Sequence, residues 1–367
     1  MLVTLIAATL IAMLAGQALP KAFAAAPAFW AHIALGLGVM TLITAAMQHF
    51  VPVLTRTRGT GPWLARLPLL MLLAAGLAVA ALGGWLDFAW IAVAALLALS
   101  GAGTMMVWMR ARAGQALGGA HPGLHWYVAA MGCLAAALAA ALLIPVVPAW
   151  HAELRAFHLH LNLYGFVALT AVGTLQVLMP TAAGQGDPAV GLRLRRDLKW
   201  ALGGALAIAV GQALLPPLTA LGVALWGWVL VRMLAAWWRL HRARILALHG
   251  AEPVLVVAVL GLAAALVGLL PVGDSAGPLA LFLPAFLMPL VTGAAGVLAP
   301  VWLNPAQASA HQAGRAALNR WGGIRALLFL SAALLPLLGY RCAGMPALTA
   351  LFWFGILFAV WIYREAR

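Results

Sequence analysis

The chain alternates between long apolar runs and short polar segments from one end to the other. Each run is about 20 residues, long enough to cross the hydrocarbon core of a membrane as a helix. Pro- and Gly-containing stretches such as "TRTRGTGP" and "AAGQGDP" separate the runs, as turns require. The pattern predicts twelve transmembrane helices, at roughly 2–20, 28–53, 65–86, 88–110, 124–147, 155–180, 196–216, 218–240, 252–271, 279–302, 322–341 and 345–364.

The composition agrees with this pattern. Of the 367 residues, 66% are hydrophobic and 8% are charged, which lies far outside the range of soluble globular domains. The connecting segments are too short for a separate soluble domain. The first run lacks a basic leading region and a convincing cleavage site, so we expect it to be retained as a helix. The expected fold class is an all-α integral membrane protein, with residues 1–367 forming one polytopic domain.

The net charge of +14 could suggest nucleic acid, but its placement indicates membrane topology instead. Only Lys21, Arg155 and Arg341 fall on one side of the predicted membrane. Arg232 lies inside the predicted span 218–240, near its cytoplasmic end. The remaining basic residues lie on the other side: Arg56, Arg58, Arg66, Arg110, Arg112, Arg193, Arg195, Arg196, Lys199, Arg239, Arg242, Arg244, Arg315, Arg320, Arg325, Arg364 and Arg367. We therefore expect both termini to be cytoplasmic, in the cell inner (plasma) membrane, with lipid and not nucleic acid as the partner.

The second, sixth and tenth predicted spans resemble one another. They end in Pro52, Pro180 and Pro300, which are 128 and 120 residues apart, and the first two prolines each follow a glutamine by four residues. Counting back twenty residues from Pro52 and from Pro180 reaches His32 and His160. This periodicity predicts three four-helix units, at roughly 1–115, 116–245 and 246–367.

Two histidines at matched positions indicate a possible ligand site. Twenty helical residues rise about 30 Å, so His32 and His160 are expected near the extracytoplasmic edge of the hydrocarbon. His158 and His151 lie on the same side, and residues 158 and 160 point about 200° apart on an α-helix. Histidines near an interface often only bond a neighbouring helix or water. Alternatively, neutral imidazole is a common ligand of haem iron and of copper.

The hypothesis is that His32 and His160 are the axial ligands of one haem, expected to be of the b type. His158 would then reach a neighbouring span or a second metal, for which copper is the candidate, together with His151 and with Asn162 one turn below as a hydrogen-bond partner.

The other histidines are expected to have structural or surface roles. His121 and His125 share a helix face at a predicted capped helix start, and His241, His249 and His311 are expected at the basic surface. The chain has no phosphate-binding glycine loop, H-E-x-x-H motif, C-x-x-C-H motif or nucleophile elbow. Asp87, Glu153 and Asp274 fall in outer loops, so the intramembrane acid typical of a proton-coupled transporter is not expected.

The set of spans, repeats and outer histidines resembles the catalytic subunit of haem-copper oxidases and nitric oxide reductases. The stretch "HLHLNLYGFVALTAVGTLQVLMP" is similar to helices of compact members, such as the haem- and copper-containing NnrS-type proteins linked to nitric oxide stress. In that family the second, sixth and tenth spans carry haem or copper ligands at their outer ends. The chain departs from it because spans 196–216 and 279–302 contain no histidine. Four-electron reduction of oxygen is therefore not expected.

Two classes of function remain open. The first is a haem protein working in electron transfer or in quinol, nitric oxide or respiratory chemistry, or as a gas sensor; its electron partner would be a cytochrome, a quinol or a copper protein. The second is a cofactor-free membrane protein that handles copper or haem or assists oxidase assembly. Whether the chain is an enzyme stays open.

Overall fold

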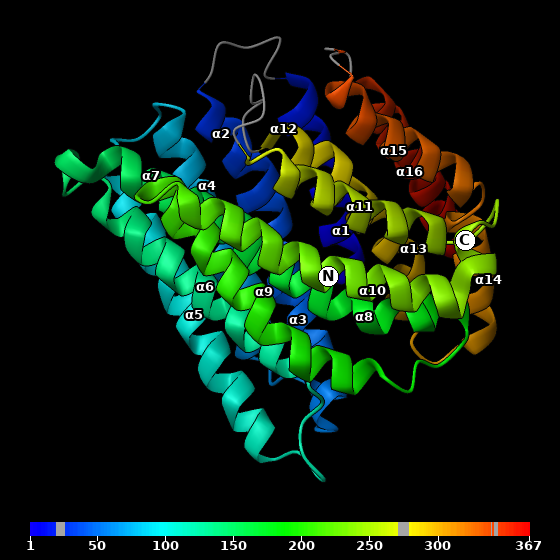
Figure 1. Cartoon of the computed structure of the whole chain (residues 1–367). Helices are drawn as coiled ribbons and strands as arrows, with labels where there is room; N and C mark the ends of the chain where they lie inside the picture. The colour runs from blue at the N-terminus through cyan, green and yellow to red at the C-terminus, as the bar shows by residue number, and fades with distance from the viewer. Residues whose placement is uncertain (20–25, 271–278, 339, 341–343) are drawn as a thin grey trace. The chain divides into compact units, whose positions relative to one another are not determined.

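A computed structural model describes the chain except residues 20–25, 271–278, 339 and 341–343 (Figure 1). Lys21, Asp274, Arg341 and Cys342 therefore lie outside the described residues. The described part of the chain is helical apart from short connections. This is the structure expected where apolar chain must satisfy its backbone hydrogen bonds without water.

A helix occupies each of the twelve segments predicted from the apolar runs. The α-helices are α1 (Leu2–Ala18), α2 (Pro27–Ala31), α3 (Thr41–Thr55), α4 (Leu67–Leu82), α5 (Trp90–Gly114), α6 (Gly123–Leu143), α7 (His151–His160), α8 (Ala168–Ala183), α9 (Val190–Ala213), α10 (Pro217–Ile245), α11 (Glu252–Val267), α12 (Leu279–Leu281), α13 (Met288–Leu303), α14 (Ala308–Leu318), α15 (Gly322–Leu337) and α16 (Gly344–Glu365).

Eight helical stretches among the described residues are long and apolar enough to cross a membrane. They are 27–55, 64–82, 90–114, 123–143, 148–183, 217–245, 279–303 and 344–365. Of the remaining predicted spans, α1, α11 and α15 are apolar but shorter, and α9 begins with the charged run "RLRRDLK". The protein is thus an all-α, multi-pass membrane protein. Helix α14 was not predicted, because its sequence "ASAHQAGRAAL" contains no long apolar run.

Two compact units make up the chain. One consists of Met1–Phe23, Leu175–Asp187 and Leu230–Arg367, and the other of Ala24–Thr174 and Pro188–Val229. We call them the C-terminal unit and the N-terminal unit, after the residues that dominate each. The histidines predicted as ligands all belong to the N-terminal unit.

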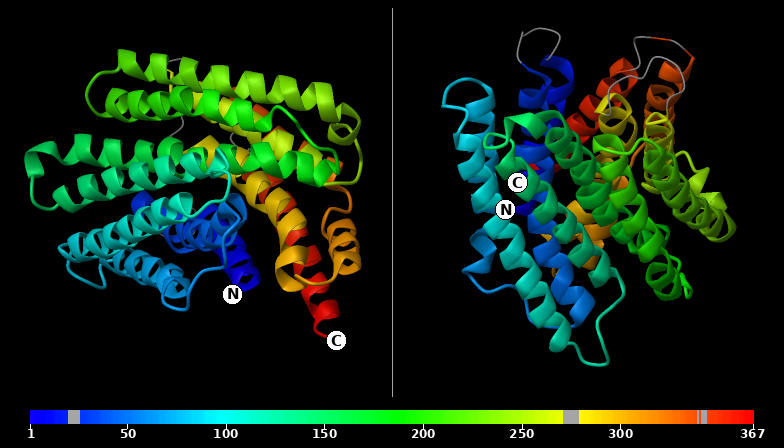
Figure 2. Two further views of the ribbon diagram at one scale, coloured as in Figure 1. Left: turned by 90° about the horizontal axis from the view of Figure 1, so that it is seen from below. Right: turned by 60° about the vertical axis from the view of Figure 1, so that its left-hand side comes forward.

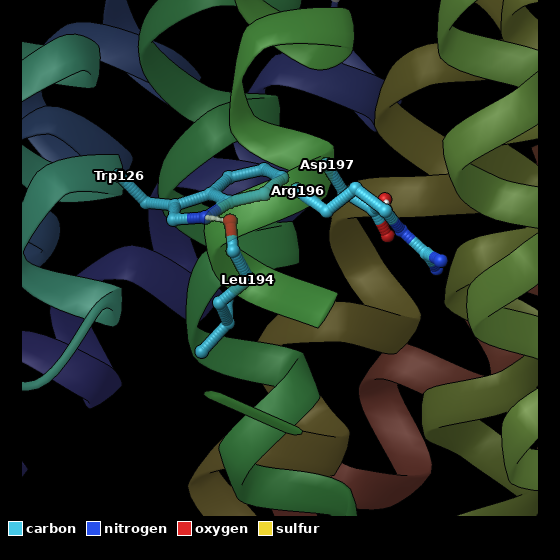
Figure 3. A network of polar contacts seen from close by, with 4 residues as sticks. All are labelled: Trp126, Leu194, Arg196 and Asp197. Carbon is cyan, nitrogen blue, oxygen red and sulfur yellow. Dashed lines mark hydrogen bonds and ion pairs between the residues drawn. The ribbon is translucent and has the colours of Figure 1, made fainter. Parts of the chain in front are cut away.

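Helix α6 is central to the N-terminal unit. It packs against α5, α7 and α9, and α4 lies beside α5 as the other arm of a hairpin (Figures 1 and 2). The indole Nε1 of Trp126 on α6 donates a hydrogen bond to the carbonyl oxygen of Leu194 on α9, 3.0 Å away (Figure 3). A Cβ added at Gly173 on α8 would lie 2.7 Å from Cβ of Trp126. This glycine therefore lets α8 approach α6 closely, as small residues do between membrane helices.

The C-terminal unit is built around α11, α13, α15 and α16. Helix α11 packs on α13 and α15, and α15 packs on α16. Gly261 on α11 lies against the backbone carbonyl of Ala285, where a Cβ would have no room. The contact explains why a glycine occupies the middle of this apolar helix.

Three segments have π-helical hydrogen bonding: η2 (His32–Met40), η5 (Leu161–Val167) and η6 (Phe282–Leu287). Each leads directly into an α-helix, α3, α8 or α13, and in each of these helices a proline is the fourth residue from the end. π-helical turns are rare and occur often at functional sites. Two of the three segments begin at or directly after a histidine that the sequence selected as a ligand.

Candidate metal site

His32 is the first residue of η2, and its ring is fixed by its own helix. Its Nδ1 lies 2.8 Å from the carbonyl oxygen of Ala28, one turn earlier. Because a carbonyl can only accept, Nδ1 carries the proton and donates it. The neutral ring therefore keeps the lone pair on Nε2 for another partner.

His158 on α7 is held in the same tautomer by a different helix. Its Nδ1 lies 2.9 Å from the carbonyl oxygen of Ala137 on α6, so Nδ1–H donates and Nε2 keeps its lone pair. A backbone carbonyl that orients the second ring nitrogen is the usual arrangement around metal-bound histidine, where it fixes the ring and raises its basicity.

The rings of His32 and His158 are stacked in the N-terminal unit. Their centroids are 6.2 Å apart and their planes differ by 7°. A metal bonded to one nitrogen of each ring, at about 2 Å, together with the two ring radii, needs centroids about 6 Å apart. The observed separation is of that size. Both rings also have the tautomer that a metal ligand needs.

His160, the last residue of α7, has different neighbours from His158, as the spacing of the two residues predicted. Its Nδ1 donates to the carbonyl oxygen of Ala156, 2.8 Å away, and its ring lies parallel to that of Tyr164 at 6.4 Å. The side chain is buried, with 5% of its surface exposed, and Nε2 has no hydrogen-bond partner among the described residues.

The structure thus brings His158, not His160, beside His32. The prediction of His160 came from counting twenty residues back from each proline, which assumes equal rise and turn per residue in both helices. Such a count compares the depths of His32 and His160, but it does not show which ring faces which neighbouring helix.

Asn162 lies beside His158, as expected one turn below it. Its amide Nδ2 donates to the carbonyl oxygen of His158 at 2.8 Å and is 3.4 Å from the ring Nε2. His151, predicted as a further metal ligand, is the exposed first residue of α7. No group of three or more His, Cys, Asp or Glu side chains arranged for a metal ion occurs in the described chain.

The other histidines mostly have structural partners. At the start of α6, His121 Nδ1 accepts the N–H of Gly123 at 3.1 Å, as a capped helix start predicts. His249 Nδ1 accepts the N–H of Trp321, and His311 Nε2 donates to the carbonyl oxygen of Asn304. His241 does not fit the predicted surface position, since it is 2% exposed at a kink inside α10.

Several charged side chains are buried, among them three carboxylates that the sequence analysis did not place and Arg325, which it assigned to the basic side of the membrane. Asp187, Asp197 and Glu252 have 7%, 0% and 4% of their surface exposed, so carboxylates are not confined to outer loops. Asp197 Oδ1 lies 3.5 Å from Nε of Arg196 (Figure 3). Arg325 is 0% exposed. The apolar residues on both sides of it in "GGIRALLFL" were the available signal.

No family model matches the chain, and no curated protein matches it.

Proposed function

We propose that the chain is a haem-binding protein of the inner membrane, related to the catalytic subunit of haem-copper oxidases and nitric oxide reductases. The observation that carries the proposal is the parallel pair of His32 and His158. In each ring Nδ1–H donates to a backbone carbonyl, and the unprotonated Nε2 keeps its lone pair for a metal. Its role would lie in electron transfer or in nitric oxide or respiratory metabolism.

The donor set suits haem because the porphyrin supplies four ligands of its own. Two imidazoles then complete the coordination of the iron, and Asn162 supports the backbone of His158. When bound, a bis-imidazole haem supplies one-electron transfer. The residues of this chain would hold the iron between η2 and α7 and keep both rings in the required tautomer.

The proposed architecture has twelve spans in three four-helix units, with both termini cytoplasmic. The repeat is supported by three segments of the same build, at residues 32–55, 161–183 and 282–303. Each begins with a π-helical segment and continues as an α-helix in which the fourth residue from the end is a proline. In the third repeat the position of the histidine is taken by Ala280, so we place one haem, in the N-terminal unit.

A second candidate function is copper handling. Two imidazole nitrogens on opposite sides of one ion also form a suitable site for Cu(I), and the spacing of His32 and His158 fits this ion equally well. The chain would then carry copper or assist the assembly of a copper enzyme without a haem of its own.

A reduced-minus-oxidised spectrum of the purified protein, combined with metal analysis, separates the two. The proposed function predicts a Soret band, sharp reduced α and β bands of low-spin haem, and about one iron per chain. A colourless protein that takes up one copper per chain would overturn the haem assignment in favour of the second candidate. A colourless protein without affinity for copper would overturn both.

A further inference from the structure

Three chain segments of the N-terminal unit meet around His121. They are the end of α3 (54–56), the connection between α5 and α6 (115–122) and the start of α9 (190–195). The backbone N–H of His121 donates to the carbonyl oxygen of Leu54 at 2.9 Å, which ties the connection to α3. A Cβ added at Gly191 would lie 4.0 Å from Cγ of Pro122, so the start of α9 lies against the start of α6.

Two arginines add positive charge to this junction. Arg56 directly follows α3, and its Nη1 donates to the carbonyl oxygen of Leu117 at 3.4 Å. Arg56 and Arg195 both lie close enough to His121 for their charges to act on its ring. Both arginines are exposed, and neither is paired with a carboxylate of the described chain. The junction is therefore open to a ligand and carries charge that its own residues do not neutralise.

The ring of His121 supplies a further donor. Its Nδ1 accepts the N–H of Gly123, so in the neutral ring Nε2 carries the proton. This Nε2–H makes no hydrogen bond with the described residues and is left to donate to a group outside them. The guanidinium of Arg56 likewise has more N–H groups than its single bond to Leu117 uses. The combination of several N–H donors and positive charge suits an anion.

The backbone at Arg56 favours a role for its side chain. Arg56 ends α3 in the left-handed region, with φ 53° and ψ 40°. Glycine is the usual residue at such a helix end, because a side chain there crowds the following carbonyl. An arginine in place of glycine accepts that strain and brings a guanidinium to the junction, and strain of this kind is typical of functional positions.

We propose that Arg56, His121 and Arg195 bind the phosphate group of an anionic phospholipid. The planar fork of a guanidinium matches two oxygens of a phosphate. Arg56 is the residue after the apolar stretch 27–55, and His121 is two residues before the stretch 123–143. Each therefore lies within about 3 Å of helical rise from the end of a stretch that can span the membrane. Basic clusters at this depth bind anionic headgroups.

The surroundings favour a lipid over a soluble anion. Leu117 and Leu192, on two of the three segments, are 78% and 73% exposed. Residues 192, 195 and 199 lie within about 60° of one another around α9. Lys199 adds a charge to this exposed face, and its Nζ lies 5.1 Å from the ring centroid of Trp200. Basic residues, an exposed leucine and a tryptophan together are typical of a helix surface that contacts lipid headgroups.

The test measures lipid binding to the purified full-length protein and to Arg56→Gln, Arg195→Gln and the double variant. The matched control is Arg110→Gln, which removes an exposed arginine near the end of α5, outside the cluster. Arg196 would be a poor control, because its Nε lies 3.5 Å from Oδ1 of Asp197 (Figure 3). The affinities for phosphatidylglycerol, phosphatidylcholine and inorganic phosphate are measured by native mass spectrometry, and melting curves check that each variant is folded.

The wild type and Arg110→Gln should bind phosphatidylglycerol equally well, and both should bind phosphatidylcholine more weakly. Each arginine near an anionic headgroup contributes about a fivefold gain in affinity. Arg56→Gln and Arg195→Gln should therefore each weaken binding of phosphatidylglycerol by about fivefold, and the double variant by about 30-fold. The substituted side chains are exposed, so the variants should fold; should the double variant not fold, the two single variants decide.

Four results would overturn the proposal. The Arg56 and Arg195 variants could bind phosphatidylglycerol as tightly as the wild type. Arg110→Gln could weaken binding as much as Arg195→Gln, which would show that binding follows total charge and not this junction. The wild type could bind phosphatidylcholine as tightly as phosphatidylglycerol. Inorganic phosphate could displace phosphatidylglycerol at equal concentration, which would assign the site to a free anion.

Discussion

Gly165→Ala should destabilise the contact that holds the candidate metal site together. Gly165 lies in η5, and a Cβ there would be 2.7 Å from Cβ of Cys133 on α6 and 2.9 Å from Cδ1 of Leu161. The Leu161 methyl can move, but Cβ of Cys133 is fixed by the α6 backbone, so η5 and α6 must separate. One turn further along α6, Ala137 provides the carbonyl that orients His158.

Overpacking of this kind costs about 1–3 kcal/mol, while replacing a helical glycine by alanine returns up to about 1 kcal/mol. Gly132→Ala is the matched control, because it lies on α6 beside Cys133 and a Cβ there meets no atom within 4 Å. The difference between the two variants, about 1–3 kcal/mol, isolates the overpacking. It should appear as a difference of a few degrees in the melting temperature in detergent.

The reciprocal exchange checks the cause. Combining Gly165→Ala with Cys133→Gly removes the clashing Cβ and should recover part of the lost stability. Equal melting temperatures for Gly165→Ala and Gly132→Ala would refute this reasoning, since a Cβ would then be tolerated equally at the two glycines.

Three further outcomes are expected. A cysteine at position 186, an exposed glycine in the loop between α8 and α9, should react with a membrane-impermeant thiol reagent only after cells are permeabilised; labelling in intact cells would reverse the proposed orientation. Burial, with Arg195 and Arg56 nearby, lowers the pKa of His121 below its ordinary value of 6.5. The unfolded chain therefore binds a proton at His121 more readily than the folded chain does, and the free energy of unfolding falls as the pH drops below about 6.5. Between pH 7.5 and 5, the melting temperature of His121→Asn should fall less than that of the wild type. An equal fall in the two proteins would contradict this. The purified chain should show no robust cyanide-sensitive oxygen uptake, because the seventh and tenth spans contain no histidine.

The sequence predicted an all-α, multi-pass membrane protein, because apolar runs of membrane length have few alternatives. Eight helical stretches among the described residues are long and apolar enough to span a membrane, so twelve spans stay a prediction. Predicted boundaries differ where a charged run extends a helix, as at the start of α9. It missed α14, which is short and polar, because hydropathy detects only apolar helices.

At the candidate site the structure shows which residues lie together, and their role as ligands stays a prediction. The sequence selected His32, His158, His160 and Asn162, and it anticipated both the divergence of His158 from His160 and the contact with Asn162. It could not select His158 as the neighbour of His32, because that depends on how η2 and α7 pack. The burial of Arg325 was missed, although the apolar residues on both sides of it in the sequence were a signal.

The central claim is that His32 and His158 hold one haem, and the most direct test is the low-spin spectrum of single histidine variants. The account predicts that His32→Ala and His158→Ala each give high-spin or haem-free protein. It predicts that His160→Ala and His151→Ala keep the low-spin spectrum of the wild type. Loss of that spectrum in His160→Ala with retention in His158→Ala would contradict the pairing, and retention in all four variants would remove the haem from this site.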